Sequence, residues 1–153
     1  MASHKRFTCF SADLACGVHN LRDHVLKIAL CAVEPDPAAD EVLDDISEVE
    51  PGHGYEAGGG ITLQKLVSEN GVLSLILSPV VFKNASTSDD ETADLIGPWQ
   101  WAVLYNASAA HNHRGRKGHP LIAAWAYRRE IDLGPQETYV WRIKGNKPVL
   151  TLG

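Results

Sequence analysis

Three histidines in one short stretch are the first candidates for chemistry in this chain. His111, His113 and His119 flank a basic run at residues 114–117. Imidazole nitrogens bind zinc and other transition metals, so three of them in one loop could form a metal site. The positive charges between them would repel a metal cation, and ligating histidines also need partners that orient their rings. The alternative is a flexible basic loop that contacts an acidic surface, such as residues 36–50 of another copy.

Other catalytic groups are present, but their spacing does not join them. A nucleophilic site would have to be drawn from Cys9, Ser11, His19 and Asp23, and a triad is recognised by geometry rather than by sequence position. Paired carboxylates, as used in glycoside hydrolysis, are plentiful between residues 36 and 56. A run of acidic residues more often forms a solvated surface. We therefore predict no enzymatic activity, no cofactor and no bound metal.

The most glycine-dense segment, residues 51–60, has some features of a phosphate-binding loop. Such loops open directly into a helix, usually with a lysine nearby. The residues that follow here, 61–67, have the pattern of a strand instead. Glycine allows backbone conformations with positive φ, so we interpret the segment as a turn or extended loop anchored by Tyr55.

Length and composition set the class of protein. The chain has 153 residues, of which 44% are hydrophobic and 22% charged, and this fits one globular domain. Its net charge of −5 argues against a nucleic-acid partner. No apolar run approaches the roughly 20 residues of a membrane helix, and the N-terminus lacks the apolar region of a signal peptide. We predict no membrane partner, folding in the cytoplasm, and reduced thiols at Cys9, Cys16 and Cys31, whose spacing matches no zinc motif.

Two long alternating segments contain three of the four tryptophans. Residues 95–106 and 120–133 begin at Gly-Pro and His-Pro breaks and alternate in the manner of two antiparallel strands. Strict alternation places Trp99 and Trp101 on one face with Val103. We expect this pair of strands to form the middle of the core.

Shorter segments complete the expected fold. Residues 7–21 have the spacing of an amphipathic helix, and residues 84–94 read as an exposed loop. Further strands are expected at residues 24–33, 61–67, 73–82 and the last part of 136–153. The fold class is mostly β, an antiparallel β-sandwich or flattened barrel with a short N-terminal helix. One domain spans residues 1–153, with an N-terminal arm and helix over 1–23 and the β-sandwich core over 24–153.

An ordered set of motifs resembles a family of small structural proteins from tailed bacteriophages. The set covers nearly the whole chain, and its order is more specific than any single motif. The matching segments are Phe10–Leu21, His24–Leu30, Ile46–Val49, Gly52–Gly59, Ile96–Asn106, Pro120–Tyr127 and Leu133–Tyr139. The chain departs from the family pattern at Ala123, where glycine is common, and at Asn112–Gly118, which looks like an inserted basic loop.

The resemblance implies a non-enzymatic virion protein made in the cytoplasm of the host bacterium. The expected role is a capsid decoration or cement protein on the phage head surface, where a trimer or dimer bridges neighbouring subunits of the major capsid protein. A tail tube, fibre or adaptor subunit is the first alternative.

The second alternative is a carbohydrate-binding β-sandwich with a platform of Trp99, Trp101, Trp125 and Trp141. Alternating spacing makes these tryptophans more typical of a core. For the virion role, partner contacts are expected from the N-terminal segment, the glycine-rich loop and the basic loop. The expected contact residues are Phe7, Phe10, Gly52, His53, Gly54, Tyr55, Gly58, Gly59, Arg114, Arg116 and Lys117.

Overall fold

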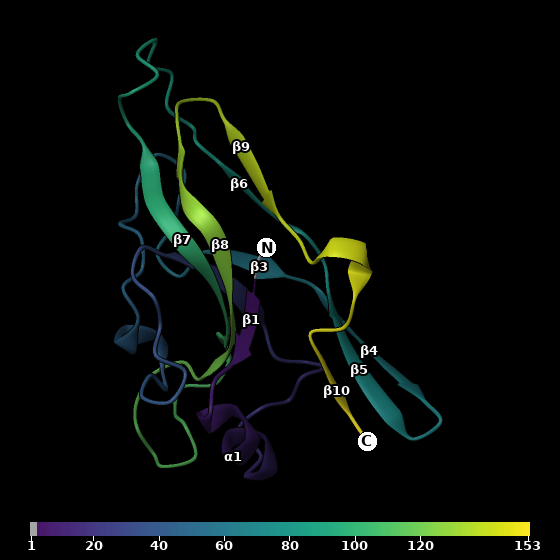
Figure 1. The fold of residues 1–153 in the computed structure, drawn as a ribbon. Helices are drawn as coiled ribbons and strands as arrows, with labels where there is room; N and C mark the ends of the chain where they lie inside the picture. The colour runs from purple at the N-terminus through teal and green to yellow at the C-terminus, as the bar shows by residue number, and fades with distance from the viewer. Residues whose placement is uncertain (1–2) are drawn as a thin grey trace.

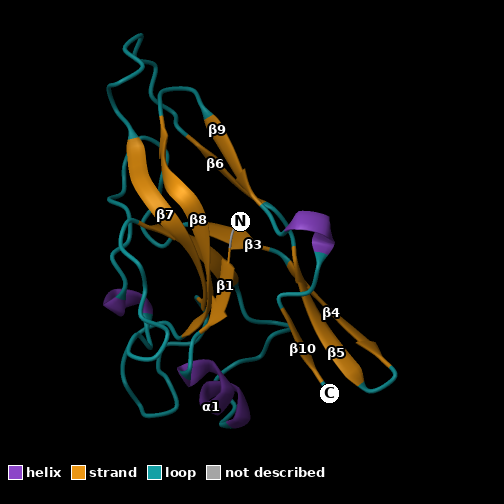
Figure 2. Cartoon of the chain, in the orientation of Figure 1, coloured by secondary structure: helices purple, strands orange, loops and turns teal. Residues whose placement is uncertain are grey.

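The computed structural model describes residues 3–153 and is built mostly of antiparallel strands, with one short α-helix near the N-terminus (Figure 1, Figure 2). This confirms the expected fold class. The largest sheet has five strands, and every neighbouring pair in it is antiparallel. Their order is β1 (Ser3–Arg6), β8 (Leu121–Leu133), β7 (Ile96–Asn106), β2 (Leu26–Cys31) and β3 (Gly60–Thr62).

Strands β7 and β8 pair with each other in this sheet, as the alternating segments predicted. The prediction of strict alternation is wrong, because a register shift separates Trp99 from Trp101. Trp99 points into the main core, whereas Trp101 lies on the opposite face with Val103 and Tyr105. A β-bulge of this kind reverses which face the following side chains occupy.

Two smaller sheets lie on the same side of the large sheet (Figure 1). One has the order β10 (Leu150–Leu152), β5 (Val72–Leu77) and β4 (Gln64–Glu69), and the other pairs β6 (Val80–Lys83) with β9 (Thr138–Trp141). Residues 61–67 were expected to form one strand, and this expectation is wrong. Residues 73–82 were expected to be strand-like with a bulge or edge at Pro79, and they form two strands that are separated there. The strand structure is interrupted between β3 and β4, and again between β5 and β6. At the second interruption Pro79 has no backbone N–H to donate to a strand ladder.

The N-terminal region differs from the sequence expectation in two respects. Residues 3–6 form strand β1 against β8, although no strand was expected there; Met1 and Ala2 of the expected arm lie outside the described residues. A short helix that ends around Gly17 to Asn20 was expected within residues 7–21; helix α1 (Cys9–Ala15) ends slightly earlier and is followed by Gly17 with φ +79°. There are also two short 3-10 helices, η1 (Leu43–Asp45) and η2 (Lys144–Asn146), in the described residues.

The main core lies between the large sheet and the two smaller sheets. Trp99, Trp125 and Trp141 are all buried there, and the last two meet edge to face with ring centroids 5.1 Å apart. A second apolar cluster covers the other face of the large sheet, where Leu43 and Ile46 of the connector after β2 pack against it. Tryptophan therefore stabilises the interior, and only Trp101 is partly exposed.

Candidate functional site

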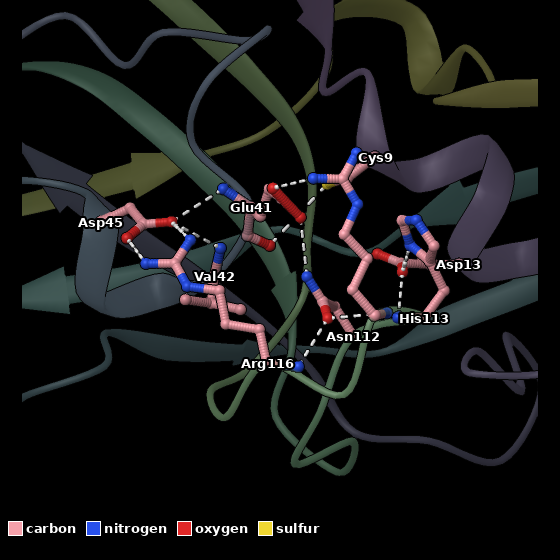
Figure 3. Close-up of polar contacts among 9 residues, drawn as sticks. Cys9, Asp13, Glu41, Val42, Asp45, Asn112, His113 and Arg116 are labelled. Atoms are coloured by element: carbon pink, nitrogen blue, oxygen red, sulfur yellow. Dashed lines mark hydrogen bonds and ion pairs between the residues drawn. The ribbon is translucent and has the colours of Figure 1, made fainter.

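Polar side chains from three segments meet beside helix α1 (Figure 3). The segments are α1, the acidic connector (residues 36–50) and the basic loop between β7 and β8 (residues 107–120). We call this group the polar clamp. Its members are Asp13, Glu41, Asp45, Asn112, His113, Arg114 and Arg116.

Asn112 fixes the shape of the basic loop. Its side-chain oxygen accepts hydrogen bonds from the backbone N–H groups of Arg114 (3.0 Å) and Arg116 (2.9 Å). Its side-chain nitrogen donates to Glu41 Oε1 at 2.7 Å, and the residue is buried. Asparagine organises many turns through such local bonds. Asn112 thus ties the basic loop to its own backbone and to the acidic connector.

The two arginines of the clamp are paired within the chain. Arg114 Nη1 lies 3.3 Å from Glu41 Oε2, and the Arg116 guanidinium bonds to both carboxylate oxygens of Asp45. Burial acts to raise the pKa of Asp45, but hydrogen bonds from Arg116 and from two backbone N–H groups outweigh it and lower that pKa. The basic loop was expected to meet the acidic connector of another copy, and here it meets its own.

Asp13 and His113 make the most deeply buried polar contact of the clamp. Asp13 is fully buried, and its Oδ1 accepts hydrogen bonds from the backbone N–H (2.7 Å) and from Nδ1 (2.5 Å) of His113. A carboxylate that holds an imidazole Nδ1 is also the orienting part of a catalytic triad. Cys9 lies one turn earlier in α1, but burial, with the Asp13 and Glu41 carboxylates adding, raises its thiol pKa to about 12. The thiol is therefore protonated and a poor nucleophile at neutral pH.

The remaining candidate catalytic residues are engaged elsewhere. Ser11 is exposed on α1, and Asp23 accepts hydrogen bonds from Asn20 and Arg22 at the surface. The His19 side chain contacts that of Asn106, which lies 87 residues later in the sequence. None of these three residues is hydrogen-bonded to the Asp13–His113 pair, so none of them is placed as its nucleophile.

The three histidines of the basic loop have separate environments. His113 is bonded to Asp13, His119 Nδ1 lies 2.7 Å from the carbonyl oxygen of Ala109, and His111 is exposed. Within residues 3–153, no group of three or more His, Cys, Asp or Glu side chains is arranged to hold a metal ion. Two of the histidines that suggested a metal site, His113 and His119, instead help to hold the loop through these contacts.

The glycine-rich loop is fastened to the large sheet by two tyrosines. The Tyr55 hydroxyl donates to Glu48 Oε2 (2.6 Å) and accepts the backbone N–H of Leu30 (3.0 Å). The same Glu48 oxygen accepts the N–H of Gly58 at 2.7 Å, and the Tyr105 hydroxyl donates to the Gly58 carbonyl oxygen at 2.5 Å. These four hydrogen bonds hold the glycine-rich loop in place.

Burial divides the residues that were expected to contact a partner. Phe7 and Phe10 are each 1% exposed and Tyr55 is 3% exposed, because all three pack in the apolar clusters. Their side chains cannot reach a partner in this fold, and Gly58 is buried as well. Exposed or half-buried positions are Gly52, His53, Gly54, Gly59, Arg114, Arg116 and Lys117.

Two histidines share the side-chain amide of Asn106. The Asn106 Nδ2 lies 2.9 Å from His19 Nδ1 and 2.8 Å from His24 Nδ1, and Asn106 is fully buried. An amide nitrogen only donates, so both imidazoles accept through an unprotonated Nδ1. His19 also packs on the ring of Phe10 with centroids 5.1 Å apart. Sequence reasoning missed this cluster, because Asn106 lies 87 residues from His19 and 82 from His24 along the chain.

His19 should make the stability of the protein depend on pH. Burial lowers its pKa from 6.5 to about 4, against the opposing attraction of Asp13 and with added repulsion from His24. Between these values the unfolded chain binds a proton that the folded chain does not. The contribution of His19 to the free energy of unfolding is therefore fully present above pH 6.5. It falls by about 2–3 kcal/mol as the pH drops toward 4.

Urea unfolding at several pH values checks this expectation. The variant His19→Phe removes the titrating group, so its unfolding free energy should fall less steeply than that of the unaltered protein between pH 6.5 and 4. Equal slopes for the two proteins would mean that other groups cause the acid sensitivity.

Exposed aliphatic side chains gather on and beside the short strands. Strand β3 and its neighbours expose Val25, Ile61 and Leu63, by 41%, 56% and 73% respectively. The β6–β9 pair exposes Val81 and Val140, by 62% and 45%. Sequence alternation could have found these positions, because each is out of phase with buried neighbours. Exposed aliphatic groups of this kind are typical of surfaces that bind another protein.

No protein-family model matches the chain, and neither a curated protein nor a solved structure matches it. In the described part of the chain, no helix has the length and apolar character needed to cross a membrane.

Proposed function

We propose that this chain is a non-enzymatic virion structural protein of a tailed bacteriophage, acting as a capsid decoration protein. It binds the outer surface of the head and bridges neighbouring subunits of the major capsid protein. A protein that binds only the assembled shell stabilises that shell by linkage. The observation that carries the proposal is the division between inward and outward groups: charged loop residues pair within the chain, and aliphatic side chains of short strands face outward.

This division suits a binding module more than an enzyme. The polar clamp and the glycine-rich loop use their hydrogen bonds to hold loops on the sheets, which gives a surface of fixed shape. Association of preformed surfaces loses less conformational entropy than association of mobile loops. The motifs that resemble phage structural proteins supply the class of partner.

Binding to capsids tests the proposal. The purified protein is mixed with capsids of its phage that were assembled without it, and the mixture is sedimented and then heated. We expect the protein to sediment with the shells at a fixed stoichiometry and to raise their melting temperature. Capsids already saturated with the protein are the control and should bind no more.

Two other results would replace the proposal. Binding to isolated tails without binding to capsids would favour a tail tube, fibre or adaptor subunit. Binding to neither particle would reject a virion role. The carbohydrate alternative has less support, since Trp99, Trp125 and Trp141 are buried and cannot form a sugar platform with Trp101.

A further inference from the structure

The outer face of the β6–β9 pair combines apolar and positive side chains. Val81 and Val140 are direct cross-strand partners, so they lie side by side on this face. Lys83 follows Val81 by two residues in β6 and so lies on the same face. Arg142 comes directly after the end of β9, so a cation lies at each end of the pair of valines. Both cations are exposed, and the ion pairs of the described residues include neither. We call this surface the basic ribbon.

A groove of about 320 Å³ has the opposite character. It lies between the end of the acidic connector, with the first residues of the glycine-rich loop, and the start of β7, and Leu95 in its lining is 38% exposed. Its apolar lining residues are Val49, Pro51, Leu95 and Pro98, and its acidic ones are Glu48 and Glu50. Glu50 is exposed and accepts no hydrogen bond in the described part of the chain. We call this surface the acidic groove.

The two surfaces complement each other in charge and in apolar character. The ribbon offers two valines between two cations, and the groove offers an apolar lining beside carboxylates. They also lie at the same end of the molecule. The backbone N–H of Ala85, two residues after the ribbon's Lys83, donates to the carbonyl oxygen of His53, which lines the groove, at 2.7 Å.

We propose that the acidic groove binds the basic ribbon of a second copy of this chain. Because each copy carries both surfaces at one end, a two-fold axis lets each groove receive the other copy's ribbon. Valines in an apolar groove form the centre of such an interface, and the charged residues form its rim and select the register. This self-association goes beyond the capsid role and does not depend on it.

Sedimentation equilibrium of the purified protein, with no capsids present, measures the association directly. We expect a dimer whose population rises with protein concentration. Glu50→Lys alters the groove and Lys83→Glu with Arg142→Glu alters the ribbon, and each variant should weaken association at least about tenfold. The changed residues are exposed, so circular dichroism should show an unchanged fold.

Mixing the two variants gives the sharpest test. In the mixed dimer one interface keeps its natural charges and the other has them exchanged, so the mixture should dimerise although neither variant does so alone. Lys65→Glu with Lys117→Glu is the matched control, because both lysines are exposed and lie outside the two surfaces. A monomer at every concentration would overturn the proposal, as would dimers that the groove and ribbon variants leave unchanged.

Discussion

Replacing Gly59 with alanine should lower the free energy of unfolding by about 4 kcal/mol. Gly59 has φ +78°, a conformation that costs an L-residue about 1 kcal/mol or more. Its missing Cβ would also overlap the carbonyl oxygen of Ile28 in β2. The backbone of the glycine-rich loop lies directly against the large sheet here, so neither side can move without breaking the pairing of β3 with β2.

Gly71 separates the two causes of that loss. It has the same φ of +78°, but nothing lies within 4 Å of the position its Cβ would take. Gly71→Ala should therefore cost only the conformational part, about 1 kcal/mol. Urea unfolding followed by tryptophan fluorescence measures both variants. If the two losses were equal, the close approach of Gly59 to Ile28 would have no energetic role.

Asp13→Ala should lower the free energy of unfolding by about 3 kcal/mol and should release the basic loop. The change removes the acceptor of two hydrogen bonds from His113 and leaves partly buried donors without that partner. Because His113 follows Asn112 directly, the loop loses its attachment to α1 next to the residue that shapes it. Trypsin cuts after arginine and lysine, so faster cleavage within residues 114–117 reports the release.

A matched variant distinguishes this effect from a general loss of negative charge. Asp44 is exposed in η1, and Asp44→Ala should change stability by less than about 0.5 kcal/mol. It should also leave trypsin cleavage of the loop unchanged. An unaltered cleavage rate in Asp13→Ala would show that the arginine pairs hold the loop without α1.

Sequence patterns predicted the regular part of this fold. Residues 99–106 and 121–128 have an alternating sequence pattern, so their strands and antiparallel pairing could be predicted. The bulge between Trp99 and Trp101 could not, because no residue type there requires it. Strand β1 was missed since its stability comes from pairing with β8 rather than from a local apolar pattern.

The polar clamp was harder to predict than the strands. The sequence drew attention to the histidines and arginines of the basic loop, but not to their partners. Asp13 and His113 are 100 positions apart, and Arg116 and Asp45 are 71 apart. Charge patterning suggested that acidic and basic segments attract each other, and only the fold decided that they do so within one chain.

Strand β1 pairs with β8, a strand that is synthesised long after it. Ser3–Arg6 lies against Ala123–Ala126, and β10 closes on β5 from the C-terminal side. Pairing such distant residues costs the entropy of closing a long loop, and this slows folding. A ribosome releases the N-terminal segments first, so β1 lacks its pairing partner until residues 121–133 have also emerged. Until then the apolar strands of this sheet can pair with wrong partners.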